Sequence, residues 1–118
     1  MSLQHVTLEL READVPAEVE FWALLGFERV DPPPPLGEKS VWVQRDGTQI
    51  HLLFTDDPIV ADGGHVAVVA DDWDATFARL RDAGHAPEEH ARPWDAARAF
   101  ARTPGGHLVE FMSEPPVR

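Results

Sequence analysis

The sequence predicts an α+β fold made of two tandem βαβββ modules. The first observation is an internal repeat. Gln4–Val6 recurs as Gly64–Val66, so that His65 follows His5 by sixty positions. Later in each half, Gly47–Leu52 aligns with Gly106–Phe111, so that His51 falls opposite Glu110. The other observation is that each half shows strand alternation, then helical periodicity, then a hairpin pattern.

The first half starts with a strand and a helix. Residues 3–10 alternate between apolar and polar side chains, with His5 on the polar face, as expected of a strand covered on one side. Asp14 is expected to cap the following helix and Gly26 to end it. The apolar residues at helical spacing are Val19, Trp22 and Ala23.

Three further strands complete the first half. Residues 27–30 begin the second strand, and 31–37 should form an extended loop because its four prolines cannot donate ladder hydrogen bonds. Residues 40–45 and 48–54 have the pattern of a hairpin, since the Asp46-Gly47 pair between them suits a two-residue turn.

The second half repeats this order after a polar linker at 55–63. Residues 64–70 form the expected strand, Asp71 or Asp72 caps the helix, and Gly84 closes it. The last elements expected are a short edge strand and loop within 86–95, and a hairpin of 97–102 and 107–113 around the turn at 104–106.

Length and composition favour one globular domain over residues 1–118, with module one at 3–54 and module two at 64–113. Each half alone would have a marginal core, so the halves should fold together. The chain contains no cysteine, which excludes disulfides, thiolate metal sites and cysteine nucleophiles. Any metal must be held by nitrogen and oxygen.

Net charge and hydropathy argue against nucleic acid and membranes as partners. A formal net charge of −11 disfavours nucleic acid, whose binding depends on clustered Lys and Arg. No apolar run approaches the roughly 20 residues that span a bilayer, and no signal-peptide pattern is present, so we expect a cytoplasmic protein without a membrane partner.

The repeat also brings four possible metal ligands into correspondence two by two. His5 aligns with His65, and His51 aligns with Glu110. Duplication explains recurring apolar residues, but it does not explain why all four positions carry groups that can bind a divalent cation. This coincidence is the main indication of function.

Four segments resemble the vicinal oxygen chelate superfamily, also called the glyoxalase, bleomycin-resistance and dioxygenase superfamily. They are Leu3–Val6, Phe21–Phe27, Gly64–Ala67 and Thr103–Phe111. The resemblance implies that the two modules form half-barrel sheets, with a metal or ligand in the cleft between half-barrels of one chain or of a homodimer. The family usually has Asp-Pro-Asp-Gly where this chain has Thr103–Gly106, which changes the turn but not the register of the next strand.

The resemblance implies that His5, His65 and Glu110 are metal ligands. Two imidazoles and a carboxylate form a facial set that suits one divalent ion per site, Fe, Zn, Ni, Mn or Co. His51 would be a fourth ligand or a catalytic base. Glyoxalase I enzymes typically have Glu at that position, so the histidine argues against true glyoxalase I activity.

Candidate substrate-binding residues are Trp42 and Trp94, which could stack on a ligand, and Arg98, which could orient an anionic oxygen. Core or surface roles explain them as well. Trp22 and Trp73 are interpreted as structural, and an exposed position is expected for His85, His90 and His107.

Two functions follow from these residues and the resemblance. The first is a metal-dependent isomerase or lyase that acts on a small oxygenated metabolite or antibiotic. The alternative is a metal-free, bleomycin-resistance-like protein that sequesters a drug in a homodimer cleft, for which acidic charge suits a cationic ligand. A noncatalytic binding partner that reuses the fold is a third class.

Overall fold

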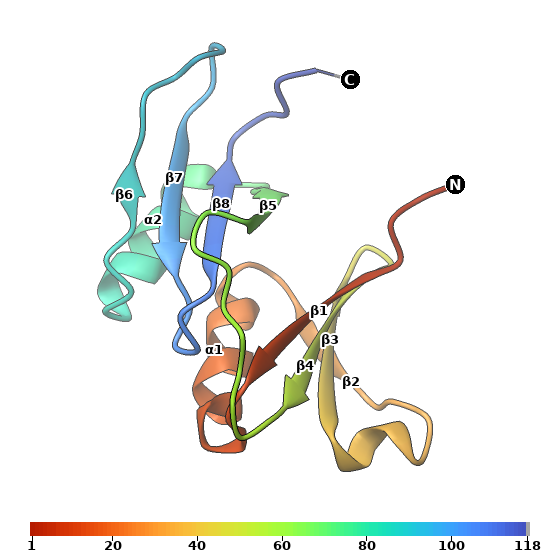
Figure 1. The fold of residues 1–118 in the computed structure, drawn as a ribbon. Coiled ribbons are helices and arrows are strands. Elements are labelled where there is room, and N and C mark those ends of the chain that lie inside the picture. The colour runs from red at the N-terminus through yellow and green to blue at the C-terminus, as the bar shows by residue number, and fades with distance from the viewer. Residues whose placement is uncertain (118) are drawn as a thin grey trace. The chain divides into compact units, whose positions relative to one another are not determined.

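The computed structural model of the protein describes residues 1–117 and divides into two compact units, Met1–Val60 and a second unit that starts at Ala61. The first unit contains β1 (His5–Leu10), the 3₁₀ turn η1 (Glu12–Asp14), α1 (Val15–Leu24), β2 (Glu28–Val30), the 3₁₀ turn η2 (Leu36–Glu38), β3 (Ser40–Arg45) and β4 (Thr48–Phe54) (Figure 1). The second unit contains β5 (His65–Val69), α2 (Trp73–Asp82), β6 (Glu88–Glu89), β7 (Arg98–Arg102) and β8 (Leu108–Met112).

Each unit is a βαβββ module with one four-stranded mixed sheet. The strand orders are β1-β4-β3-β2 and β5-β8-β7-β6. In both sheets the first strand pairs parallel with the last, and the other pairs are antiparallel. Neither sheet closes on itself, and the predicted α+β fold with tandem modules is confirmed.

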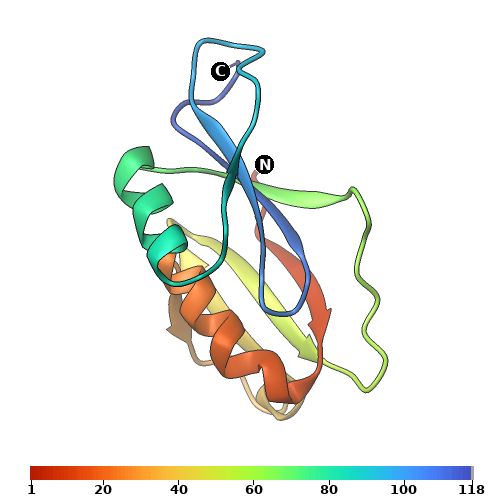
Figure 2. The ribbon, with the colours of Figure 1, turned by 90° about the vertical axis from the view of Figure 1, so that its left-hand side faces the viewer.

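In each unit the helix lies against one face of its own sheet (Figure 2). The first core contains Trp22, which is fully buried with its ring edge against Phe27, together with Leu52. In the second, Trp73 and Phe77 of α2 pack on Phe111 of β8 at centroid distances of 5.8 and 6.3 Å. Because strand side chains alternate, the opposite face of each sheet remains open for function.

The start of α1 differs from the expectation. Asp14 occupies the cap position but makes no capping hydrogen bond through its side chain, because η1 leads directly into the helix and holds Asp14 at φ −87° and ψ −9°. A capping side chain requires an extended backbone. Asp72 has that backbone, at φ −135° and ψ 96°, and its Oδ1 accepts from Ala75 N at 3.0 Å, so of the two candidates it is Asp72 that caps α2.

The buried face of α1 also differs from the predicted stripe. Ala23 is exposed, whereas Glu18 is fully buried and accepts a 3.0 Å hydrogen bond from Trp22 Nε1. An acidic residue was not expected in the core. A hydrogen-bonded carboxylate can be buried there because its charge-stabilising partner lies on the same helix face, one turn away.

Of the two predicted loops of the first unit, one agrees with the prediction and the other differs from it. Asp46 and Gly47 both have positive φ, 50° and 82°, as the predicted tight hairpin turn requires. The proline-rich segment does not stay extended to residue 37, because η2 begins at Leu36 with a hydrogen bond from Leu36 N to Pro33 O. Within residues 1–117 no helix is long and apolar enough to cross a membrane.

Candidate functional site

The open face of the first sheet brings together side chains from three strands. Strand pairing places Thr7 of β1 and Trp42 of β3 on either side of His51 of β4. His5 precedes Thr7 by two positions, so its side chain projects from the same face. The predicted ligand pair of this module therefore shares one surface.

The rings of Trp42, His51 and His5 form one continuous stack. His51 lies parallel to Trp42, with 3.8 Å between centroids and 2° between planes. On its other side the His5 ring is 4.0 Å away and inclined by 11°. Two nearly parallel imidazoles cannot both direct their in-plane lone pairs at one point. The two imidazoles of the first module are thus not arranged to bind the same ion.

Glutamine side chains fix the protons of both histidines. Gln4 Oε1 lies 2.6 Å from His5 Nδ1, and Gln49 Oε1 lies 2.8 Å from His51 Nε2. Because amide oxygens only accept, those ring nitrogens donate. In the neutral rings the lone pair is then on Nε2 of His5 but on Nδ1 of His51. Gln49 is itself oriented, since its Nε2 donates to Gln44 Oε1 at 2.8 Å.

Burial lowers the pKa of His51 from its usual value of 6.5, and the positive charge of protonated His5 lowers it further. Both causes favour the neutral ring. The His51 ring is therefore neutral at physiological pH. A cavity of about 520 Å³ adjoins the stack and is lined by Gln4, His5, Thr7, Leu36, Ser40, Trp42, Gln49, His51 and Leu53.

The second sheet repeats the arrangement with charged groups. Strand pairing places Ala67 of β5 and Phe100 of β7 on either side of Glu110 of β8. His65 precedes Ala67 by two positions on the same face. Phe100 is therefore the counterpart of Trp42, a correspondence that sequence reasoning missed although alternation along residues 97–102 could have revealed it.

Glu110 is buried and bonded through both carboxylate oxygens. Oε2 accepts from Arg98 Nε at 2.8 Å, and Oε1 lies 3.2 Å from His65 Nε2. The other nitrogen of His65, Nδ1, lies 2.9 Å from Gly63 O and must donate to it. When the His65 ring is neutral, its Nε2 and Glu110 Oε1 are therefore two hydrogen-bond acceptors that face each other. A proton or another cation between them is needed for a favourable contact.

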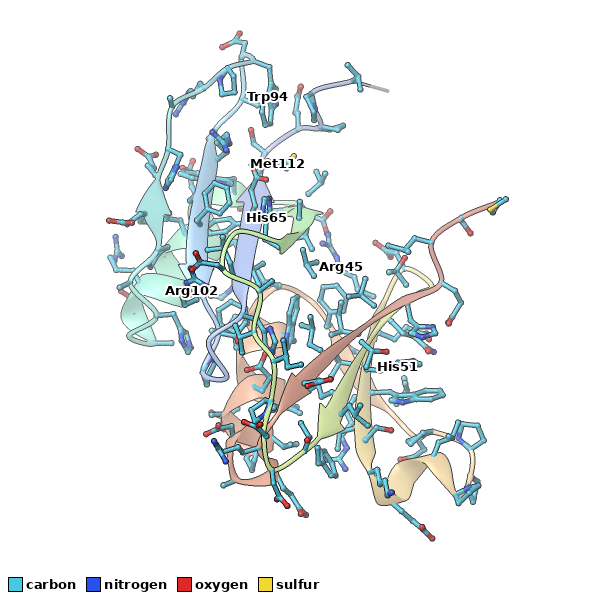
Figure 3. The ribbon with its side chains drawn as sticks, in the orientation of Figure 1. Arg45, His51, His65, Trp94, Arg102 and Met112 are labelled. Carbon is cyan, nitrogen blue, oxygen red and sulfur yellow. The ribbon has the colours of Figure 1, made fainter. Side chains whose placement is uncertain are left out.

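Arg98 and Trp94 have structural partners. Besides Glu110, Arg98 donates through Nη1 to Ala91 O at 3.0 Å, and its guanidinium lies 5.6 Å from the Trp94 ring centre. Trp94 Nε1 donates to Glu114 O at 2.9 Å. Arg98 therefore orients the predicted ligand Glu110. Trp94 lies in the loop between β6 and β7 and ties it to Glu114 (Figure 3).

The three histidines expected to be exposed differ from one another. His107 is buried, with 6% of its surface exposed, because the Thr103–Gly106 turn folds back and Thr103 Oγ1 accepts from His107 N at 3.1 Å. His85 is half-buried. Only His90 is exposed as expected, with its ring 4.6 Å from that of Phe100.

Each unit by itself supplies two of the four predicted ligands. No group of three or more His, Asp or Glu side chains converges on a point among the residues that the structure describes. Sequence reasoning also missed Gln4 and Gln49, which set the tautomers of the histidines. Their positions could have revealed them, because Gln4 directly precedes His5 and Gln49 lies two residues before His51.

Comparison with known proteins identifies the family. The Glyoxalase/Bleomycin resistance protein/Dioxygenase superfamily profile matches residues 2–111. No curated protein matches the sequence. Among solved structures, a glyoxalase family protein from Bacillus anthracis is 23% identical with a TM-score of 0.83, and the match covers 95% of this chain and 93% of that one.

Other similar structures differ in function. TioX from Micromonospora sp. ML1 is 24% identical, with a TM-score of 0.70 and coverage of 95% and 98%. Lactoylglutathione lyase from Agrobacterium tumefaciens is 21% identical, with a TM-score of 0.70 and coverage of 94% and 92%. At such identities the likeness shows a shared fold. Together with the match over nearly the whole sequence, it establishes that this chain belongs to the glyoxalase/bleomycin resistance protein/dioxygenase superfamily.

Proposed function

We propose that the protein is a divalent-metal-dependent enzyme of isomerase or lyase type, acting on a small oxygenated metabolite or antibiotic. The observation that carries this proposal is the unmatched pair of acceptors, His65 Nε2 and Glu110 Oε1, on an open sheet face. Their protonation pattern is that of a metal ligand whose second ring nitrogen is fixed by a backbone carbonyl.

The donor chemistry fits a divalent ion. His65 Nε2 and Glu110 Oε1 lie 3.2 Å apart, close enough for one divalent ion to bind both. His5 supplies a third donor, since Gln4 fixes its Nδ1 proton and leaves Nε2 as the lone pair. The proposed ligands are therefore His5, His65 and Glu110.

His51 has a different role in this proposal. Its Nε2 is bonded to Gln49 and its ring is parallel to His5, so it is poorly disposed to share an ion with His5. Its lowered pKa keeps it neutral. His51 would instead accept the substrate proton on Nδ1, while Gln49 holds the proton on Nε2.

The bound ion would polarise a substrate carbonyl or hydroxyl and stabilise the developing oxyanion. The chain's own residues prepare the site for this. Arg98 holds the Glu110 carboxylate in position, and Trp42 fixes the plane of the His51 ring. We further propose that the protein is a homodimer, because β1 and β5 are edge strands whose pairing groups need cover.

Metal content tests the proposal. Protein purified without added metal or an affinity tag should contain about one divalent ion per site by elemental analysis. His5→Ala and Glu110→Ala should lose the ion. His51→Ala should keep the ion and lose activity, and Glu28→Ala, at an exposed position of β2, should keep both. Absence of metal from wild-type protein after reconstitution with Ni, Zn, Mn and Fe(II) would reject the proposal.

The alternative is metal-free drug sequestration, and the three-ring stack favours it. Trp42 and His5 are the end rings of the stack, each with one face against His51, and both line the first cavity. The net charge of −11 suits a cationic ligand that stacks on an aromatic ring. A planar cationic drug should then bind chelator-treated protein and lose affinity in Trp42→Ala. Binding that depends on added metal would decide against this alternative.

A further inference from the structure

A second cavity, of about 620 Å³, lies on the open face of the second sheet and combines aromatic and cationic side chains. It is lined by Gly63, His65, His85, Ala86, Glu88, His90, Arg98, Phe100, Ala101, Arg102 and Leu108. Its volume falls within the range of small-molecule sites, about 300–1,000 Å³. It borders the proposed ligand His65, so a molecule bound here would lie beside the ion.

The two arginines of this cavity have different partners. Arg98, Phe100 and Arg102 project from one face of β7 because side chains alternate along a strand. The charge of Arg98 is balanced by Glu110 at 2.8 Å. Arg102, by contrast, donates only to carbonyl oxygens, to Gly106 O at 3.1 Å and to Asp62 O at 3.2 Å. Among residues 1–117, no carboxylate neutralises it.

Arg102 carries its positive charge in a chain where acidic residues outnumber basic ones by 21 to 10. The two carbonyl bonds hold the guanidinium at the end of β7 (Figure 3). They use two of its five N–H donors, which leaves donors for a planar, bidentate contact with an oxyanion. Glu88 lines the same cavity but forms no ion pair with Arg102 within the described chain.

Aromatic rings form the wall beside this cation. The Phe100 ring lies 5.2 Å from that of His65 and 4.6 Å from that of His90. We propose that this cavity binds an organic oxyanion, a carboxylate or a phosphoryl group on a flat body, with the oxyanion on Arg102 and the body on Phe100. The inference rests on the proposed function, since it names the class of substrate that the metal site would process.

We expect an organic oxyanion to bind at Arg102 even when no metal is present. Benzoate, phenylphosphonate and neutral benzamide are matched probes, to be titrated by calorimetry into the chelator-treated full chain. Benzoate or phenylphosphonate should bind at least about tenfold more tightly than benzamide, which is about 1.4 kcal/mol. The tighter of the two anions identifies the carboxylate or the phosphoryl class.

Variants locate the interaction. Arg102→Gln should weaken binding of the preferred anion about tenfold, as expected for a lost charge-assisted contact, whereas Arg102→Lys should keep part of it. Arg29→Gln is the matched control, because it changes net charge equally from an exposed strand position in the first unit. Glu88→Gln should strengthen anion binding by removing a nearby negative charge.

In wild-type protein, the Arg102 Nε–H resonance should shift on addition of the preferred anion, which tests the contact even if Arg102→Gln unfolds. Equal binding of anions and benzamide, equal losses in the Arg102 and Arg29 variants, or an unshifted resonance would overturn the inference. Metal content is measured in an untreated portion of each preparation, after reconstitution. A preparation that holds metal but whose chelator-treated portion does not bind the anion refutes the anion site alone. A preparation that binds the anion but cannot be loaded with metal refutes the metal proposal alone.

Discussion

The two modules share one topology but present different chemistry on equivalent positions. Trp42, His51 and His5 make a ring stack on the first sheet. Their counterparts Phe100, Glu110 and His65 belong to a charged network on the second sheet, which includes Arg98. Strand pairing determines where side chains meet, and the identity of one residue in each set, His51 or Glu110, determines whether they stack or form ion pairs.

Truncation in the core of either module should have the largest effect on stability. Phe111→Ala removes the ring on which Trp73 and Phe77 pack, and should lower the free energy of unfolding by about 4 kcal/mol. Leu52→Ala in the first core should cost about 3 kcal/mol. Urea denaturation followed by circular dichroism measures both.

The same experiment tests whether residues 1–118 form a single domain, as we propose. One cooperative transition that moves to lower urea in both variants supports this. Two separate transitions, with only the altered module shifted, would show that the modules unfold independently.

Removal of the Glu110 carboxylate should lower stability more than removal of the His51 ring. Glu110→Ala leaves Arg98 without its partner at a largely buried position, and should cost about 3 kcal/mol in metal-free protein. His51→Ala removes only ring contacts and one hydrogen bond, and should cost about 1 kcal/mol. Equal losses in urea denaturation would contradict the distinction between the two sites.

Substitutions at the N-termini of the two helices should differ less in their effect on stability. Asp72→Ala should destabilise the protein by about 1 kcal/mol, because it removes the hydrogen bond to Ala75 N that caps α2. Asp14→Ala should change stability much less, since the Asp14 side chain does not cap α1. Thermal unfolding of the two single variants makes the comparison, and a larger loss for Asp14→Ala would show that the cap assignment is wrong.

The smallest effect expected is a pH dependence that is specific to the first module. The pKa of His51 is lower in the folded protein than its usual 6.5, so the unfolded chain binds more protons between these two values. Stability should therefore fall as pH decreases from about 6.5 through the folded pKa, and the loss should be complete below it.

Urea denaturation of metal-free protein between pH 5 and pH 8 would detect this effect. His51→Gln should flatten the dependence, and the exposed His90→Gln should retain it. An unchanged profile in His51→Gln would mean that another group is responsible.

The sequence by itself determined the βαβββ repeat, the Asp46-Gly47 turn and the correspondence of His5 with His65 and of His51 with Glu110. These follow from alternation, turn chemistry and the internal repeat, which are local or periodic signals. The same signals could not distinguish a capping Asp72 from an uncapped Asp14, because the difference lies in the backbone angles at which each helix begins.

Only the tertiary structure decided which partners the site residues have. The burial of Glu18, the pairing of Arg98 with Glu110 and the placement of Phe100 opposite Glu110 join residues from different turns or strands. Proton positions on His51 and His65 likewise depend on which acceptor lies beside each ring nitrogen. Sequence specifies which groups are available, whereas their protonation, charge balance and stacking depend on distances that only strand pairing establishes.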